Sequence, residues 1–147
     1  MKIIDSSSLI FSYENNINLE GTFFVIGDLD EEFELVELIH NQKRSNIVQA
    51  STLPNYSEAY YLTQYSLMLN RHAGHSFTSM RGFGDIAILA LVQSSLDNFG
   101  QPNQTSLGLF GNTEDVIIVI TNDTGLTKRL KSEFDDRVLV LANEDLM

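Results

Sequence analysis

The sequence predicts an α/β fold in which helices flank a central, mostly parallel β-sheet. Short apolar runs rich in β-branched residues alternate with helical patterns along the chain, and this alternation is typical of parallel sheets. The chain has 147 residues, the length of one ordinary domain with a core of its own. No internal repeat is evident, so we expect a single domain over residues 1–147.

The chain opens with two short strands separated by a helix. Residues 2–5 form an apolar run closed by aspartate, which predicts a buried strand, and the serines at 6–8 suit the cap of a short helix through 9–13. Gly21 introduces a β-branched and aromatic run at 22–26, which we expect to be the second strand.

The next region contains two helices and a short extended segment. Acidic residues at 28–32 favour the positive end of a helix dipole, so we expect a helix from there to about His40. Residues 46–50 fit either a short strand or an extended link. Pro54 then precedes a helical pattern over 57–70.

A buried helix between two loops follows. Residues 71–84 contain three glycines and two histidines, which predict a loop. From Asp85 to about Leu96, apolar residues cover nearly every side of a helix, and this pattern is typical of a buried helix. The stretch 97–115 is rich in Gly, Asn and Gln and predicts a loop insertion. Its few large apolar side chains indicate either a partly anchored flap or a contact with another chain.

The C-terminal part returns to the alternation of strands and helices. Residues 116–120 have a fully apolar strand pattern, 125–133 a helical pattern and 137–141 a last strand pattern. Because strands alternate with helices, we expect the strands to lie parallel in one sheet.

Composition excludes several classes of protein. The longest apolar runs, at 86–92 and 116–120, are far below the roughly 20 residues of a transmembrane helix. The N-terminal region lacks the pattern of a signal peptide, so we expect a soluble, cytoplasmic protein. With no cysteine in the chain, disulfides, thiolate zinc sites and cysteine nucleophiles are excluded.

The net charge of -11 argues against binding nucleic acid over the whole surface, because phosphate contacts need lysine and arginine. Local binding stays open, since Lys128, Arg129 and Lys131 follow Asp123 closely and Arg81 lies four positions before Asp85. The three clustered cations also fit a solvated helix face whose positive charges complement the C-terminal end of the helix dipole.

Three aspartates far apart in the sequence stand at the end of an apolar run or at the start of a helix. Asp5 closes the first strand pattern, Asp85 opens the buried helix, and Asp123 follows a late strand pattern. Residues just beyond the carboxyl ends of parallel strands converge in one crevice. Carboxylates brought together there repel one another unless a cation joins them, and hard divalent ions take oxygen ligands. The three aspartates therefore predict a metal site.

In these features the chain resembles the PIN-domain nucleases. That family joins a first strand ending in aspartate, here Asp5, to a Gly-Asp with an apolar helix behind it, here Gly84 and Asp85. A Thr-x-Asp motif after a late apolar strand completes the likeness, here Thr121 and Asp123. The resemblance covers nearly the whole chain and rests on the order of short motifs and their places on the predicted elements.

The family also carries an acidic residue on an early helix, and Glu37 fits that place. The resemblance implies a metal-dependent ribonuclease whose catalytic carboxylates hold one or two Mg²⁺ or Mn²⁺ ions: Asp5, Glu37, Asp85 and Asp123. We expect contacts with the RNA substrate, or support of the carboxylates, from five further residues: Ser6, Arg81, Thr121, Asn122 and Lys128.

The resemblance also implies partners. Many small stand-alone members are toxins of toxin-antitoxin pairs, commonly dimerise and are held inactive by a partner protein. We therefore expect an RNA substrate, an antitoxin protein and a second copy of the chain as partners, and no membrane.

Three alternatives stay open. Each aspartate is also in a place where it would merely cap a helix. The chain could keep the fold with a weak metal site and act by binding a protein, an alternative that the net charge of -11 and the loop at 97–115 favour. The same carboxylates would also serve a structure-specific DNA nuclease.

Overall fold

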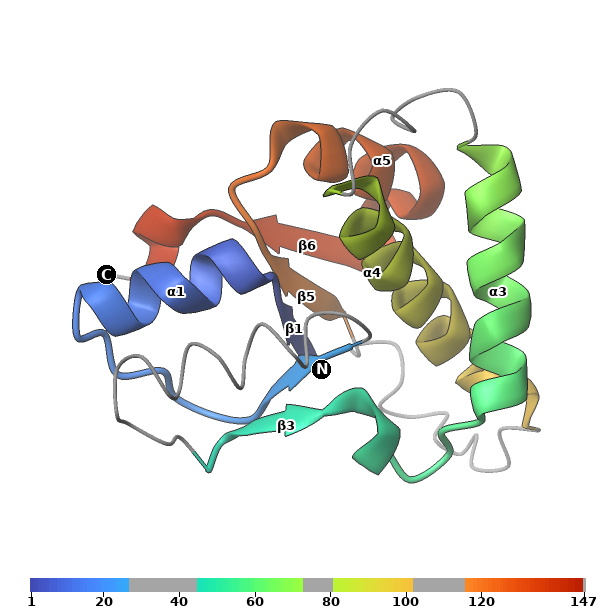
Figure 1. Ribbon diagram of the computed structural model, residues 1–147, viewed down its shortest axis with the longest axis horizontal. Coiled ribbons are helices and arrows are strands. Elements are labelled where there is room, and N and C mark those ends of the chain that lie inside the picture. Colours follow the sequence, from blue (N-terminus) through green and yellow to red (C-terminus); the bar gives the residue numbers. More distant parts are fainter. Residues whose placement is uncertain (27–44, 73–80, 102–115, 147) are drawn as a thin grey trace. The chain divides into compact units, whose positions relative to one another are not determined.

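The computed structural model of the chain describes residues 1–26, 45–72, 81–101 and 116–146 (Figure 1). The chain forms two compact units, of which unit 1 consists of Met1–Gln49 and Val116–Met147 and unit 2 of Ala50–Asp115. The predicted helix from residue 28 to His40 and most of the predicted loop insertion lie outside the described residues.

Among the described residues, unit 1 contains a five-stranded sheet in which all neighbouring strands run parallel. In order across the sheet, the strands are β3 (Ile47–Gln49), β2 (Phe23–Val25), β1 (Lys2–Ile4), β5 (Ile117–Ile120) and β6 (Val138–Leu141). The α/β class with a parallel sheet is therefore confirmed, and the segment at 46–50 contains a strand. The earliest strand in the chain, β1, lies at the centre of the sheet beside the late strand β5.

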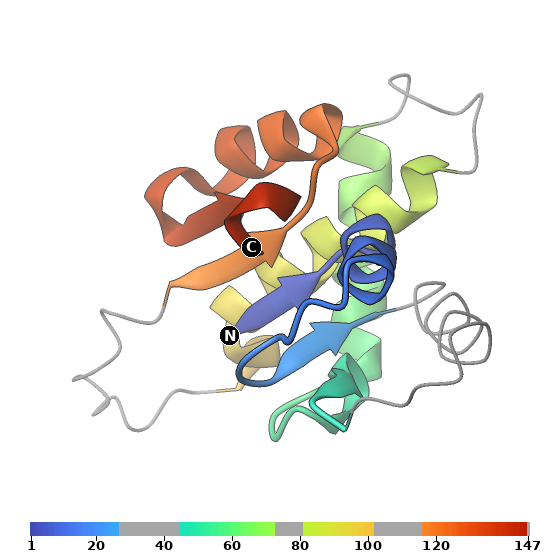
Figure 2. The same ribbon diagram turned by 90° about the vertical axis from the view of Figure 1, so that its left-hand side faces the viewer.

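Among the described residues of unit 1, two α-helices and two short 3₁₀ helices accompany this sheet, one of the latter being η4 (Asp135–Arg137) between α5 and β6. Helix α1 (Ser6–Glu14) follows β1, and α5 (Thr124–Phe134) follows β5 and packs against β6 (Figure 2). The 3₁₀ helix η5 (Asn143–Leu146) follows β6 and contacts α1. Side chains alternate between the two faces of a strand, so Val138 and Val140 share the face of β6 that is opposite to Leu139.

The core of unit 1 explains why the central strands have uninterrupted apolar sequences. A strand of a parallel sheet that is covered on both faces buries successive side chains, not alternate ones. Ile3, Ile4 and Val119 are accordingly fully buried. On α5, apolar residues at intervals of four form one buried stripe, namely Leu126, Leu130 and Phe134.

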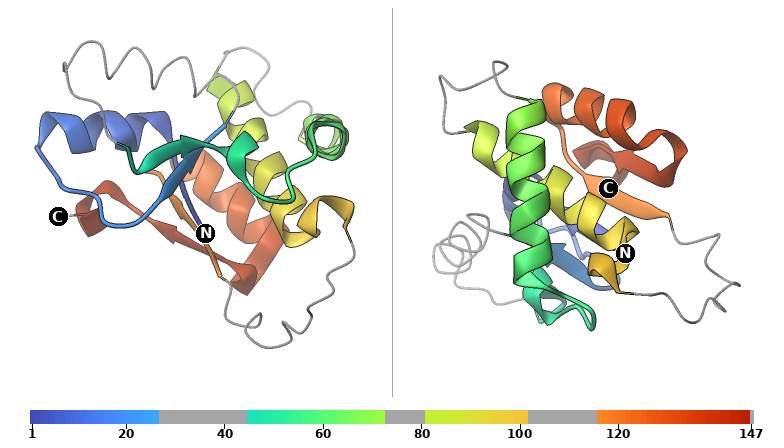
Figure 3. Two further views of the ribbon diagram at one scale, coloured as in Figure 1. Left: turned by 90° about the horizontal axis from the view of Figure 1, so that it is seen from below. Right: turned by 90° about the vertical axis from the view of Figure 1, so that its right-hand side faces the viewer.

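The described part of unit 2 contains two α-helices that lie side by side, α3 (Glu58–Arg71) and α4 (Arg81–Leu96) (Figure 3). The N-cap of α3 is Ser57, whose hydroxyl accepts a hydrogen bond from the backbone N–H of Tyr60. The predicted helix at 57–70 is thus confirmed almost to the residue. Every residue of α4 from Ile86 to Val92 is buried, as the apolar pattern predicts. None of the described helices is long and apolar enough to cross a membrane.

Two predicted helix starts are wrong. Helix α4 begins at Arg81 and not at Asp85, so the predicted loop at 71–84 is too long. A glycine inside a helix costs about 1 kcal/mol, whereas burying one aliphatic side chain contributes about 1.5–3 kcal/mol. The burial of residues 86–92 therefore outweighs the cost of Gly82 and Gly84 in the helix, and α4 extends back to Arg81. Helix α1 likewise includes the serines from Ser6 onward, which were expected to precede it.

A polar clasp holds the end of α4 to α3 within unit 2. The Tyr60 hydroxyl donates to Asp97 Oδ2 at 2.6 Å, and Gln93 Nε2 donates to both oxygens of that carboxylate at 3.1 Å. The chain then turns through a 3₁₀ helix at Asn98–Gly100, in which Phe99 packs on Tyr56 with ring centroids 5.2 Å apart. The first residues of the predicted loop insertion are thus ordered by contacts with α3.

The turn after the clasp requires glycine at position 100. Gly100 has φ +77°, and a Cβ there would lie 2.9 Å from Tyr60 Cδ2. We expect Gly100→Ala to lower the free energy of unfolding by about 1–3 kcal/mol, measured by urea unfolding. Gly84→Ala is the matched control, because a Cβ there meets no described atom within 4 Å. The control should raise stability by about 0.5–1 kcal/mol, and equal effects of the two substitutions would contradict this account.

The clasp also predicts a dependence on alkaline pH. The hydrogen bond to Asp97, followed by burial and the charge of that carboxylate, raises the pKa of Tyr60 above its ordinary value of 10.0. The fold thus favours the neutral phenol, so the stabilisation is fully present below pH 10 and is lost as the pH rises through the folded-state pKa. Urea unfolding between pH 8 and 11 should show a shallower alkaline loss for Tyr60→Phe than for the native chain. Identical slopes would show that this hydroxyl does not contribute.

Candidate functional site

The two central strands of unit 1 end side by side. In the register of the sheet Ile4 lies opposite Ile120, and the N–H of Asp5 donates to the Ile120 carbonyl at 3.0 Å. Asp5 therefore leaves β1 at the same level at which Thr121 leaves β5. This is the carboxyl edge of the sheet, where parallel α/β folds bind ligands.

Thr121 joins the two aspartates of this edge. Its side chain is only 2% exposed. Its hydroxyl donates to Asp5 Oδ2 at 2.8 Å and accepts a hydrogen bond from the backbone N–H of Asp123 at 3.0 Å. A single buried oxygen thus orients one carboxylate and fixes the backbone that carries the other. We call Asp5, Thr121 and Asp123 the carboxylate cluster.

The two carboxylates of the cluster have different local roles. Asp123 is the N-cap of α5, and its Oδ1 accepts from the Leu126 N–H at 3.0 Å, as the capping alternative predicts. Its other oxygen, Oδ2, forms no hydrogen bond to any described residue, and the residue is exposed. Asp5 precedes α1, but its side chain makes no capping hydrogen bond. Helix capping therefore explains the position of one Asp123 carboxylate oxygen, and it does not explain the position of the Asp5 carboxylate.

The electrostatic setting of the cluster favours negative charge. Helices α1 and α5 begin immediately after Asp5 and Asp123, so the positive ends of two helix dipoles adjoin the cluster. These dipoles offset part of the repulsion between the carboxylates. They also favour anionic groups of a ligand at the same edge.

The remaining acidic residues of the predicted site lie elsewhere in the chain. Glu37 is outside the described residues. Asp85 belongs to unit 2, where it is half-buried in the second turn of α4 and hence is not an N-cap. Within residues 1–26, 45–72, 81–101 and 116–146, no three His, Asp or Glu side chains are grouped to hold a metal ion.

The predicted cations occupy helix positions. Lys128 is exposed on the second turn of α5, and Lys131 lies in the last turn, where its charge complements the dipole. Arg81 is the first residue of α4, and its side chain is outside the described part of the chain.

The predicted polar contacts differ in detail from the observed ones. Ser7 and not Ser6 has a hydroxyl near Asp5 Oδ2, at 3.5 Å, which is the outer limit of a hydrogen bond. The Asn122 Oδ1 accepts the backbone N–H of Asn143 at 2.7 Å and so connects the β5–α5 turn to the residues after β6. Sequence reasoning missed Asn143, because nothing in its neighbourhood indicates a contact with a turn 21 positions away.

The donor chemistry of the cluster fits a hard divalent cation. Both carboxylates supply oxygen, and Mg²⁺ is usually held by one or two carboxylates with several waters completing its shell. The hydrogen bonds from Thr121 and Leu126 restrain one oxygen on each carboxylate. Asp5 and Asp123 thus offer carboxylate oxygens of the kind that such an ion takes.

Comparison of the chain with protein-family models, with curated proteins and with solved structures finds no match. The resemblance to PIN-domain nucleases therefore rests on sequence motifs alone, those at Asp5, Glu37, Gly84, Asp85, Thr121 and Asp123.

The role of Thr121 can be tested with an isosteric substitution. Thr121→Val removes both hydrogen bonds of a buried hydroxyl and should lower the free energy of unfolding by about 1–3 kcal/mol. It should also move the NMR shift of the Asp123 amide proton. Thr121→Ser keeps the hydroxyl and should leave that shift in place, at the cost of one methyl group. An unmoved Asp123 amide in Thr121→Val would contradict the arrangement.

Proposed function

We propose that the protein is a metal-dependent ribonuclease that hydrolyses phosphodiester bonds in RNA. The observation that carries this proposal is the buried Thr121 hydroxyl, which holds Asp5 and the Asp123 backbone together at the carboxyl edge of the sheet. Two carboxylates beside two helix N-termini form an electrostatic setting suited to a phosphate group and its cation.

Asp5 and Asp123 would hold Mg²⁺ or Mn²⁺, and in the proposal Glu37 and Asp85 complete the ligands. Such an ion, when bound, lowers the pKa of a coordinated water and stabilises negative charge on the attacking and leaving oxygens. Thr121 keeps the Asp5 carboxylate in one orientation. Asn122 acts as a positioning residue, because its contact with Asn143 fixes the turn that carries Asp123.

The substrate would be held by few cations. With a net charge of -11, the chain repels nucleic acid over most of its surface. Lys128 and Arg81 are the proposed phosphate contacts, together with Ser6 at the N-terminus of α1. A short single-stranded or structured RNA suits this limited set of cations better than a long duplex.

The proposed partners follow from the same resemblance. As a toxin of a toxin-antitoxin pair, the protein would form a homodimer and would be held inactive by an antitoxin protein. Its activity in the cytoplasm would then depend on the supply of that partner.

Cleavage of labelled single-stranded RNA tests the proposal. We expect cleavage with Mn²⁺, none with EDTA, and a loss in Asp123→Asn and Asp5→Asn. Removing an outer-shell partner of a metal site typically costs 10–100-fold, so loss of a ligand should cost at least about 100-fold. Asparagine still caps a helix and still accepts from Thr121, so both variants should remain folded. Glu14→Gln, a change at an exposed acid of α1, is the matched control and should retain activity.

The other arms of this experiment separate the alternatives. Cleavage of flap or single-stranded DNA but not of RNA would replace the ribonuclease by a DNA nuclease. A ligand that binds only the folded state raises the melting temperature, so Mn²⁺ should stabilise the native chain and not Asp123→Asn. No cleavage of any substrate together with no stabilisation by Mn²⁺ would contradict the proposal and favour a protein-binding module.

A further inference from the structure

The outward face of α3 has two exposed leucines and no charge between its ends. Among the described residues, Leu62 is the most exposed large apolar side chain at 53%, and Leu67 is 48% exposed. Glu58 and Arg71 are the first and last residues of the helix, and no charged residue lies between them. A single exposed leucine is ordinary, but the solvent-facing side of a surface helix usually has charged and polar residues. This face therefore has the composition of a contact surface.

The inward side of α3 determines which residues are left outside. Tyr61 and Met68 are its buried residues, seven positions apart and hence on one face, and the helix contacts α4. The exposed residues of α3 are Glu58, Ala59, Leu62, Thr63, Ser66, Leu67, Asn70 and Arg71.

These exposed residues are self-complementary about the middle of the helix, between Gln64 and Tyr65. Equal steps in the two directions from that point join a hydroxyl with a hydroxyl, a leucine with a leucine, a small residue with a short amide, and an acid with a base. The pairs are Thr63 with Ser66, Leu62 with Leu67, Ala59 with Asn70, and Glu58 with Arg71. Helix periodicity explains the spacing but not the residue types. A two-fold contact between identical chains requires such matching, because residue i contacts j and j contacts i.

The charges of unit 2 favour an antiparallel contact over a parallel one. The Tyr60 hydroxyl donates to Asp97 at the end of α4, so Asp97 and Glu58 stand at the same end of the helix pair. Within the described part of unit 2, the other charged residues belong to the opposite end, which has two bases and one acid: Arg71, Arg81 and Asp85. An antiparallel contact brings the negative end of one copy to the positive end of the other, whereas a parallel contact brings like charges together.

The net charge of -11 opposes association of two copies, but most of it lies in unit 1. Residues 50–115 contain five acidic and two basic residues. At physiological ionic strength, exposed charges more than about 8 Å apart are largely screened. Repulsion between two copies that meet through α3 is therefore small.

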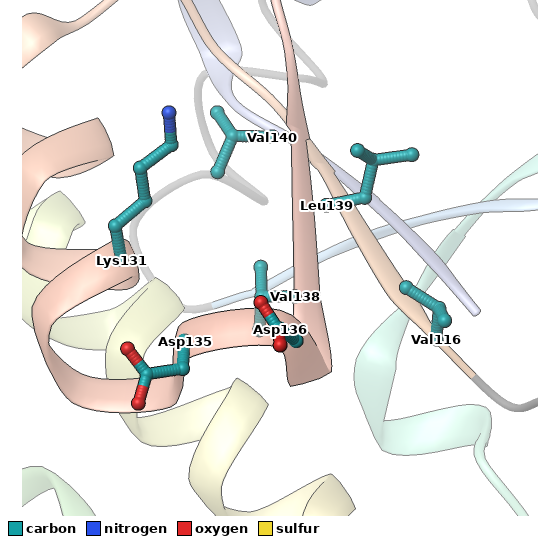
Figure 4. A pocket seen from close by; sticks show the side chains of 7 residues that line it. All are labelled: Val116, Lys131, Asp135, Asp136, Val138, Leu139 and Val140. Carbon is teal, nitrogen blue, oxygen red and sulfur yellow. The ribbon is translucent and has the colours of Figure 1, made fainter. Parts of the chain in front are cut away.

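The other two exposed large apolar side chains of the described residues lie in a different setting (Figure 4). Leu139 and Val116 line a groove in unit 1. Lys131, Asp135 and Asp136 line the same groove, so charges of both signs stand beside its apolar groups. That mixture selects no particular partner, whereas the face of α3 matches a second copy of itself.

We propose that two copies of the chain associate through α3, with the helices antiparallel about a two-fold axis between Gln64 and Tyr65. The leucines supply the apolar contact. The Thr63 hydroxyl donates to the Ala59 carbonyl at 2.9 Å, so burying it leaves no unpaired donor. This assigns a surface to the homodimer on grounds independent of the carboxylate cluster, and it holds whether or not the chain cleaves RNA.

The size of the contact sets the expected affinity. A helix of 14 residues is about 21 Å long at a rise of about 1.5 Å per residue. One helix from each copy forms an interface at the small end of the range for specific complexes. We therefore expect a reversible dimer with a Kd on the order of micromolar.

Sedimentation velocity of the full chain, from about 1 µM to about 300 µM, tests the association. The native chain should pass from monomer to dimer over this range. Leu67→Glu places a carboxylate against the apolar groups of the other copy and should stay monomeric throughout. Leu139→Glu is the matched control, because Leu139 is also 48% exposed but lies on β6, and it should still dimerise. Circular dichroism checks that both variants remain folded.

Single cysteines test the orientation, since the chain has none of its own. In the antiparallel contact, Ala59 of one copy lies level with Asn70 of the other, whereas the two Ala59 residues lie eleven positions apart, about 17 Å along the helices. A disulfide needs Cα atoms within about 7 Å. A mixture of Ala59→Cys and Asn70→Cys chains should therefore form a linked dimer on mild oxidation, at least about tenfold faster than either variant alone.

Three results would overturn the proposal. The first is a native chain that stays monomeric at every concentration. The second is a dimer that Leu67→Glu leaves intact, which would place the interface elsewhere. The third is linkage of Ala59→Cys to itself as fast as in the mixture, which would exclude the antiparallel contact. None of these readouts involves RNA cleavage, so they are separate from the test of the proposed function.

Discussion

The carboxylate cluster depends on one buried hydroxyl. Thr121 connects the carboxyl ends of β1 and β5, where Asp5 and Asp123 stand. The hydroxyl donates to one carboxylate and accepts from the backbone of the other residue, so its donor and acceptor capacities are both used. Burial makes these bonds valuable, because an unpaired polar group in that place would be costly. The neutral residue Thr121 therefore holds both Asp5 and the backbone of Asp123 at the carboxyl edge of the sheet.

The same hydrogen bonds connect the site to the body of the sheet. Asp5 is attached to the Ile120 carbonyl through its own backbone, and Asn122 is attached to Asn143 beyond β6. The turn after β5 is thus held on both sides by neighbouring strands. A turn held in this way lets Asp123 cap α5 with one oxygen, while its other oxygen forms no hydrogen bond to a described residue.

Much of the fold could be predicted from the sequence, and particular residues show why. The central strands are buried on both faces, so Ile3, Ile4 and Val119 stand in plain apolar runs. Helix α3 begins directly after Ser57, and serine is a residue type that commonly caps helices. Helix starts were harder, because Gly82 and Gly84 indicate a loop locally, whereas the burial of α4 overrides them. The contact of Asn122 with Asn143 could not be predicted, since it depends on the register between β5 and β6 and not on any local pattern.

The pairing of the first strand with the late strand β5 also governs how the chain folds. The hydrogen bond from Thr121 to Asp5 joins residues 116 positions apart, whereas α3 and α4 of unit 2 are neighbours in sequence. Contacts between residues close in sequence form quickly. A contact between distant residues forms more slowly, because closing the long loop between them lowers the entropy of the chain. Unit 2 therefore has the topology of a fast, early-forming element, and the β1–β5 pair that of a slow one. The carboxylate cluster needs this distant pairing, so we expect the site to form only in chains in which β1 and β5 have already paired.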